Sequence, residues 1–208
     1  MSSNVYAFTR RDGETGDKKA GARHVPAQRL GEGEGGKGKK EGTVVNVSVD
    51  VIFRDVWGHM QDYPNWNHHL QRVEVVLDIT PRCRLVYQVL HPVGNGIIWS
   101  RDIVAIMYWD KEGDGIYISL ASTSWPALPP SSQYVRATFY PQGYVYAPMP
   151  GDPEKTLIRL VHHIDVHLAF IPAPVISLIL AKTGRDTVMQ FRDHLENLRK
   201  EFTGLGGV

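Results

Sequence analysis

Three polar residues, His163, Asp165 and His167, alternate along one stretch of the chain. If this stretch is a β-strand, the three side chains project from the same face of the sheet. Two imidazoles and a carboxylate form a ligand set that transition metals accept. Ligation from positions i and i+2 of a strand is unusual without a further ligand nearby, so we expect no metal site here.

Motifs for covalent or phosphate chemistry are not found. The sequence has neither a Gly-x-Ser-x-Gly nucleophile elbow nor a Cys-His signature. The Gly-rich residues 31–42, GEGEGGKGKKEG, do not follow a strand in a βαβ unit and are not a phosphate loop. We therefore expect no catalytic residue and no cofactor, and residues 31–42 are predicted to form a flexible loop.

Composition and charge limit the class of partner. A chain of 208 residues with 42% hydrophobic content predicts a single domain, residues 1–208, with a sizeable core. Lys and Arg number 23 and Asp and Glu 22, a balance that does not predict nucleic-acid binding or tight binding to an anionic membrane. The lone Cys83 excludes an internal disulfide and fits a reducing compartment. We see no signal-peptide pattern and no run of about 18 apolar residues, so the expected location is cytoplasmic.

The elements that must position functional side chains are mostly strands. Alternating or β-branched runs, separated by turn residues and without helices between most of them, predict an antiparallel sheet. These runs are NVYAFTR, ARHVPAQRL, TVVNVSV, VEVVLDI, RLVYQVL, DIVAIMYW, IYISLAST, YVRATFY, YVYAP and TLIRLVHHIDVHLAF.

Two helices complete the predicted fold. Ser48 is a candidate N-cap for a helix over VDVIFRDVWGHM. From Pro174 to Phe202 apolar residues recur at helical spacing, which predicts a long amphipathic helix with a kink at Gly184. The fold class is therefore α+β: a curved antiparallel sheet of about nine strands wrapped around a long C-terminal helix. A helix is a narrow cover for a wide sheet, so we expect a cavity between the two.

Six segments in order resemble the StAR-related lipid-transfer (START) domain family over roughly residues 43–202. They are WNHHLQRVEVV, VYQVLHP, SRDIVAIMYW, ISLASTSWPALP, YVRATFYPQGYVYAP and HHIDVHLAFIP, nearest in wording to phosphatidylcholine-transfer and ceramide-transfer members. The resemblance implies a helix-grip fold, a hydrophobic tunnel for one lipid, transfer of that lipid between membranes and no catalytic residue. Family members usually begin with a long helix, which residues 1–30 do not resemble.

The resemblance also implies which side chains line the tunnel. Met107 stands where sterol-binding and phosphatidylcholine-binding members place a cavity Arg, and Gln88 stands where sterol members carry its acidic partner. We therefore expect a ligand without a deeply buried phosphate: a sterol, fatty acid, diacylglycerol or ceramide rather than a phospholipid. Strand alternation together with family position predicts the lipid-binding set Asn67, Gln88, Leu90, Met107, Ile118, Leu120, Phe139, Val175, Leu178 and Ile179, the last three closing the cavity from the helix.

Apolar residues next to a surface turn predict a membrane contact. In GNGIIWSRD the turn Gly94–Gly96 is followed by Ile97, Ile98 and Trp99, and Trp favours bilayer interfaces. In the family this loop is a lid beside the tunnel mouth, and a second lid precedes the last helix, here with Phe170 and Ile171. The alternative is that Ile97–Trp99 begin a buried strand. Arg101 and Asp102, which follow, are expected to brace the fold and to satisfy each other.

Three function classes remain open from the sequence. The first is a lipid carrier that meets membranes transiently as a peripheral protein. The second is a lipid-sensing regulatory module without transfer activity. The third is an enzyme on a related helix-grip scaffold, since a fold does not determine a function.

Overall fold

The fold is a broad sheet with two helices. The computed structural model describes residues 39–168 and 171–204, which belong to one compact unit, Gly35–Val208. The predicted strands NVYAFTR and ARHVPAQRL lie outside the described residues. The elements are β1 (Lys39–Val45), α1 (Val49–Gly58), the 3-10 helix η1 (Met60–Asn65), β2 (Leu70–Thr80), β3 (Cys83–Leu90), β4 (Arg101–Glu112), β5 (Gly115–Ser122), β6 (Val135–Arg136), β7 (Thr138–Phe139), β8 (Gln142–Met149), β9 (Asp152–His162), β10 (Ile164–Asp165) and α2 (Ala173–Gly204).

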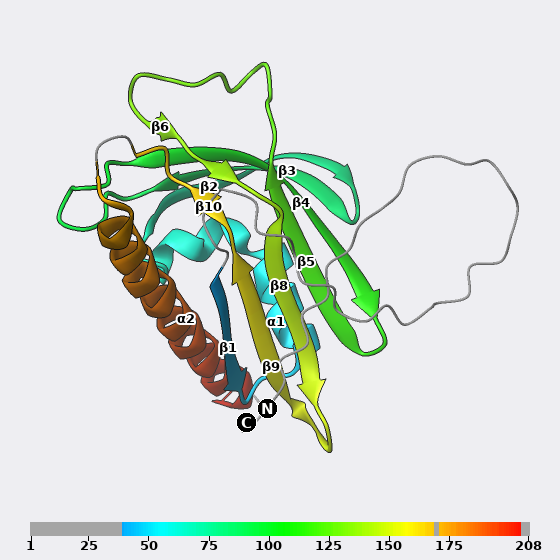
Figure 1. Ribbon diagram of the computed structural model, residues 1–208. Helices are drawn as coiled ribbons and strands as arrows, with labels where there is room; N and C mark the ends of the chain where they lie inside the picture. The colour runs from blue at the N-terminus through cyan, green and yellow to red at the C-terminus, as the bar shows by residue number, and fades with distance from the viewer. Residues whose placement is uncertain (1–38, 169–170, 205–208) are drawn as a thin grey trace, which may run out of the picture. The chain divides into compact units, whose positions relative to one another are not determined.

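Eight strands form the main sheet, in the order β1-β9-β8-β5-β4-β3-β2, with β6 beside β4 (Figure 1). All neighbours along this path are antiparallel, and only the short β6 runs parallel to its partner. β7 and β10 pair separately. The sheet is not closed into a barrel, so β1 and β2 are its edges, and the β2–β3 register shifts at three places. The predicted class, an antiparallel sheet of about nine strands with a long C-terminal helix, is confirmed.

Both helices cover the same face of the sheet. One hydrophobic cluster contains Ile52 and Val56 of α1, Phe191 and Leu195 of α2, and buried residues of the central strands such as Ile118. α2, orange to red in Figure 1, lies beside β1. We call the sheet face that points into this cluster the inner face.

The first helix follows its prediction closely. It begins after Ser48, whose extended backbone has the N-cap conformation, although its side chain makes no capping hydrogen bond. Val49, Ile52 and Val56 are buried at helical spacing. The predicted helix is two residues too long, because Met60 already belongs to η1.

Three strand predictions differ from the structure. β1 begins at Lys39, so residues 39–42 of the predicted flexible loop pair with β9 instead. The run YVRATFY is divided at Ala137, whose amide donates to the Asp102 carbonyl as the chain passes from the main sheet to the small one. The last strand is divided at His163, whose amide donates to the Gln142 side chain and thus leaves the strand ladder. Side-chain acceptors of this kind carry no signal in the hydrophobic pattern.

α2 spans 32 residues and continues through Gly184. Its buried side chains are near the C-terminal end, where Phe191 and Leu195 enter the core. Val175 precedes Phe191 by 16 residues, which places it roughly 160° around the helix. The apolar residues of the first turns therefore lie on a different face from those of the last turns, although the sequence pattern reads as one continuous stripe.

Substitutions on two faces of α2 should separate buried from exposed apolar positions. Leu195 is fully buried and Met189 is 53% exposed. Leu195→Ala should lower the free energy of unfolding by about 2–5 kcal/mol, because it leaves a cavity in the core. Met189→Ala should change it by less than about 0.5 kcal/mol. Urea denaturation measures both, and equal losses would contradict the assignment of the buried face.

Candidate functional site

The inner face holds most of the predicted tunnel residues. Register pairs Met107 with Leu120, and alternation along β5 adds Ile118 to the same face. These three side chains are buried in the main cluster. Gln88 pairs with Ile103 of that cluster, and Gln88 and Leu90 are half-buried. The alternation argument therefore brings these five positions to one surface.

Asn67 and Phe139 lie at the margins of this surface. Phe139 is half-buried and packs against the main cluster. Asn67 is buried, and its Oδ1 accepts a hydrogen bond from the His69 amide at 3.1 Å. This bond spans two residues, the geometry of an Asx turn, so Asn67 shapes the chain between η1 and β2.

The helix side of the predicted site is different. Leu178 is 72% exposed and Val175 is 40% exposed. The structure therefore does not bring these two side chains to the inner face, because they occupy the outer side of the first turns of α2. Ile179 is half-buried, and a Cβ on Gly94 would lie only 2.8 Å from its Cδ1 atom. The turn at Gly94 thus rests directly on α2.

The loop after Gly94 exposes two of its three apolar residues. Ile97 is 49% exposed and Trp99 is 72% exposed. Ile98 is buried and forms a β-bridge with Val93, so its assignment to the membrane-contact set is not supported. The alternative that all three begin a buried strand is also wrong, since β4 begins at Arg101. In the second predicted lid, Phe170 lies outside the described residues and Ile171 is half-buried.

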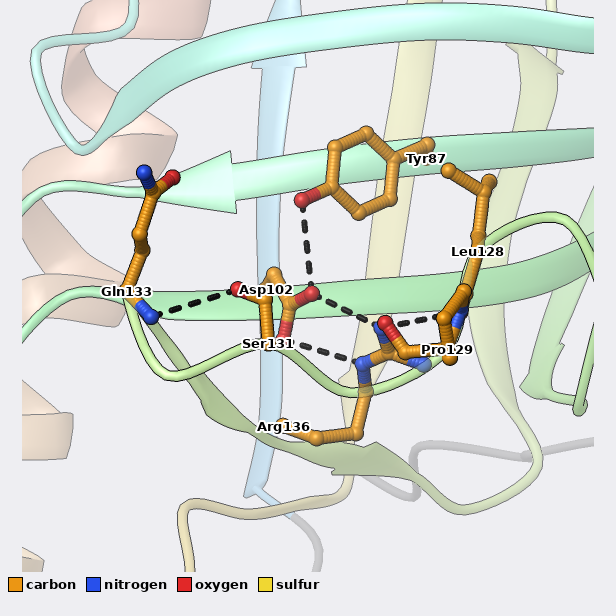
Figure 2. Close-up of polar contacts among 7 residues, drawn as sticks. All are labelled: Tyr87, Asp102, Leu128, Pro129, Ser131, Gln133 and Arg136. Atoms are coloured by element: carbon orange, nitrogen blue, oxygen red, sulfur yellow. Dashed lines mark hydrogen bonds and ion pairs between the residues drawn. The ribbon is translucent and has the colours of Figure 1, made fainter.

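Arg101 and Asp102 do not pair with each other, because neighbours on a strand point to opposite faces. Figure 2 shows the environment of Asp102. Its carboxylate accepts two hydrogen bonds from Arg136, at 2.9 and 2.8 Å, and one from the Tyr87 hydroxyl at 3.3 Å. The Arg136 guanidinium also donates to the carbonyls of Leu128 and Pro129. This network fastens the Pro-rich loop over the outer face of β3 and β4.

Arg101 bonds to the first predicted lid and to the segment just before the second one. Its Nε and Nη2 donate to the Val166 carbonyl at 3.1 and 2.9 Å, and its Nη1 donates to the Trp99 carbonyl at 2.7 Å. The side chain is buried, and desolvation lowers the pKa of the guanidinium. No ion pair of Arg101 occurs within the described part of the chain, so carbonyl dipoles alone compensate its charge.

A polar group on the inner face was not predicted. Tyr144 and Tyr146 of β8 and His162 of β9 point into the core, with the two phenol rings parallel and 6.1 Å apart. The His162 ring meets Tyr144 edge-on at 6.0 Å. Burial raises the pKa of Tyr144 to about 12, raises the pKa of Tyr146 well above its usual value, and lowers the pKa of His162 to about 4. The alternation Tyr-Val-Tyr was the available signal, but it reads as ordinary strand patterning.

The residues of the metal hypothesis make separate contacts in the structure. His167 lies 3.9 Å from Asp165, but its Nε2 is 3.0 Å from the Thr138 hydroxyl. The His163 ring stacks against Tyr140, and its Nε2 is buried. Across residues 39–168 and 171–204, no cluster of three or more His, Cys, Asp or Glu side chains is placed to hold a metal ion.

Two surface pockets accompany this core. A groove of about 570 Å³ runs between the Pro-rich loop and Val104, and a second of about 440 Å³ lies at Asn46 and Arg199. Neither is lined by a predicted tunnel residue. Among the described residues, no helix is long and apolar enough to cross a membrane.

An open antiparallel sheet that packs its inner face against a long C-terminal helix defines a helix-grip fold. The chain matches the START domain over residues 33–201 and belongs to this family. It is 26% identical over 160 residues to the mitochondrial steroidogenic acute regulatory protein of Salvelinus fontinalis, and the match covers 77% of this chain and 54% of that protein. The chain thus spans about half the length of the curated relatives it matches.

Solved structures share the fold at low identity. Human StAR-related lipid transfer protein 5 has a TM-score of 0.70 at 17% identity, and the match covers 77% of this chain and 76% of that chain. The aromatase/cyclase Zhui from Streptomyces has a TM-score of 0.57 at 12% identity, with 83% and 99% covered. A carrier and an enzyme therefore have the same architecture, and the fold alone does not choose between their functions.

The bonds of Arg101 can be tested through the two segments that they join. Arg101→Met should speed amide hydrogen exchange about tenfold in both residues 94–99 and residues 166–168, because these segments lose their shared donor. Arg72→Met is the control, since Arg72 is exposed and contacts the nearby Glu74 and the Tyr87 ring, neither of which lies in the two segments. Exchange measured by mass spectrometry should be unchanged in the centre of β4. Uniform acceleration over the whole sheet would contradict a local role.

The buried imidazole of His162 should make stability depend on pH. Between about pH 6.5 and 4 the unfolded chain binds a proton at this residue and the folded chain does not, so stability falls as the pH falls. The full effect is roughly 3 kcal/mol. His162→Gln should lose less stability than the wild type between pH 7 and pH 4.5 in urea titrations. The exposed His59→Gln should behave as the wild type, and the same slope for all three proteins would contradict the assignment.

Proposed function

We propose that this protein binds one lipid between the inner face of the sheet and α2 and transfers it between membranes without catalysing a reaction. The observation that carries the proposal is the state of the inner-face side chains. Gln88, Leu90, Phe139 and Tyr144 keep accessible surface although they lie against the main cluster. Desolvation nevertheless dominates the pKa of Tyr144. Accessible surface on side chains surrounded by protein is what an internal space would produce, and membership of the START family supports a lipid as its occupant.

The charges on the inner face favour a lipid without a buried phosphate. Met107 stands where some family members place a cavity Arg, and it is buried in the main cluster. Arg84 also lies on this face, but it donates to the Trp57 carbonyl at 2.7 Å and pairs with Asp78 at 3.0 Å. The Arg101 guanidinium already donates hydrogen bonds to the carbonyls of Val166 and Trp99. With both cations engaged, a sterol, fatty acid, diacylglycerol or ceramide fits better than a phospholipid, because a buried phosphate needs a cation.

The exposed apolar residues support a transient membrane contact. Ile97 and Trp99 lie on the loop that rests against α2, and Val175 and Leu178 are exposed on the first turns of that helix. Two basic residues, at positions 182 and 185, are exposed on the following turns. Apolar groups beside basic ones bind a bilayer interface weakly and reversibly. We accordingly propose a cytoplasmic protein that is peripheral and transient at membranes, with no nucleic-acid partner.

Transfer has a nearly balanced free energy, because the lipid leaves one apolar environment for another. Removing each methylene from water is worth about 0.8 kcal/mol. The free-energy barrier to transfer therefore lies in any step that exposes the hydrocarbon chains of the lipid to water. A protein that opens while it touches the membrane lowers this barrier. Native mass spectrometry of the purified protein followed by lipid extraction tests binding directly. A bare protein that also moves no sterol or ceramide between vesicles would overturn the proposal.

The alternatives predict different observables. A lipid-sensing module would bind a lipid without moving it between vesicles. An enzyme on this scaffold, the hypothesis that the likeness to Zhui favours, would change a bound small molecule chemically. The shared fold at 12% identity is its only support, so the carrier is preferred.

Adjacent isoleucines give a matched test of the membrane contact. Ile97→Ser with Trp99→Ala should slow transfer between vesicles about tenfold, because burial of such side chains in the interface is worth about 1.5–3 kcal/mol. The melting temperature should hardly change, since both residues are exposed.

The control is Ile98→Ser, one residue away. It places a hydroxyl at a buried position and should lower the free energy of unfolding by about 2–4 kcal/mol. Unchanged transfer by the Ile97 and Trp99 variant would exclude this loop from the membrane contact.

A further inference from the structure

Tyr144, Tyr146 and His162 place polar atoms in a region that is otherwise apolar. Tyr146 is 1% exposed and is a member of the main cluster with Ile118 and Ile158. Tyr144 lies two residues along β8, with its ring parallel to that of Tyr146. His162, on the neighbouring β9, faces the edge of Tyr144. Three hydrogen-bonding side chains therefore lie together on the inner face.

These polar groups have no partner within the described protein. Over residues 39–168 and 171–204, the Tyr144 and Tyr146 hydroxyls and the His162 ring make no hydrogen bond to another protein group, and none of them is among the fully enclosed polar atoms without a partner, so each keeps some accessible surface. Tyr63, which lies near Tyr146, already donates to the Val56 carbonyl at 3.4 Å. Most buried polar groups in proteins are hydrogen-bonded, and leaving one without a partner is unfavourable. Three such groups side by side, each with accessible surface, offer hydrogen bonds to a partner from outside this part of the chain.

We propose that Tyr144, Tyr146 and His162 form the subsite for the polar end of the bound lipid, and that this end is an uncharged hydroxyl or carbonyl group. The inference rests on the proposed lipid-binding function and names where and how the ligand is recognised. Phenols donate and accept hydrogen bonds, and a neutral imidazole does the same through its two nitrogens.

An ionised ligand does not fit this subsite. Burial keeps both phenols and the imidazole neutral, so none supplies a positive charge to a carboxylate or a phosphate. Asp55, on α1, raises the pKa of Tyr146 by its negative charge and would repel an anion. Within the wider set of possible lipids, the subsite therefore selects a sterol, ceramide or diacylglycerol over a fatty acid or a phospholipid.

Single-chain probes of equal length test the subsite whatever the natural ligand is. Dissociation constants of hexadecanol, hexadecane and palmitate are measured at neutral pH by displacement of anilinonaphthalene sulfonate from the full chain. In Tyr144→Phe with Tyr146→Phe, the ratio of hexadecanol to hexadecane affinity should fall about tenfold relative to the wild type, through loss of two hydrogen bonds. The wild type should also prefer hexadecanol to palmitate.

The control is Tyr108→Phe, which removes an exposed hydroxyl that donates to Asp110 and should leave the ratio unchanged. An unchanged ratio in the double variant, with all three probes still bound, would overturn the subsite and leave the proposed function standing. Failure of every probe to bind, hexadecane included, would overturn the proposed function itself.

A second measurement needs no ligand. If the Tyr146 hydroxyl has no partner in the protein, ligand-free Tyr146→Phe should melt at the same or a higher temperature than the wild type, because a polar group without a partner is removed from the core. A melting temperature lower by several degrees would show that the hydroxyl is bonded within the protein, and it would overturn the inference.

Discussion

The structure depends on one requirement: an eight-stranded sheet must remove its apolar inner face from water, and among the described elements only α1 and α2 are long enough to cover it. Sheets bury such a face against another layer of secondary structure. α1 covers the strands near Tyr146, and the last turns of α2 contribute Phe191 and Leu195. The first turns of α2 contribute no fully buried side chain among the described ones. Incomplete cover at this end is the physical origin of both the proposed binding site and the exposed loop that would serve it.

Arg101 holds the chain in place at the incompletely covered end of the sheet. Its five possible donors allow one side chain to hold carbonyls from two segments that are far apart in sequence. The bonds to Val166 and Trp99 fix two segments near the start of α2: the chain that leads into the helix and the loop that contacts it. Burial makes the cation unfavourable unless these acceptors are in place. A single residue at the start of β4 thus couples the position of the exposed loop to that of the segment leading into α2.

The sequence predicted the fold class and most strands because both rest on local patterns. Alternation placed Gln88, Met107 and Leu120 on one face, and the structure agrees. The helix side failed for Val175 and Leu178, since a continuous apolar stripe does not reveal how far a helix rotates between its two ends. In the loop, Trp99 is exposed and Ile98 is buried, a difference that goes with the Val93–Ile98 β-bridge and that the sequence pattern does not reveal. The Tyr144, Tyr146 and His162 group was missed because unpartnered atoms are a property of the folded chain, not of its sequence.

An open sheet also has a cost that a closed barrel avoids, since the backbone groups of its last strand are free to pair with another chain. β2 is such a strand, and its exposed residues include Leu77 and Ile79. Three register irregularities bend its pairing with β3, and the Arg72–Glu74 pair adds charge along the same strand. Bulges and charges of this kind oppose the flat, regular edge on which intermolecular sheets and aggregates grow. The irregular β2 therefore opposes the addition of a second copy of this chain at the open edge of the sheet.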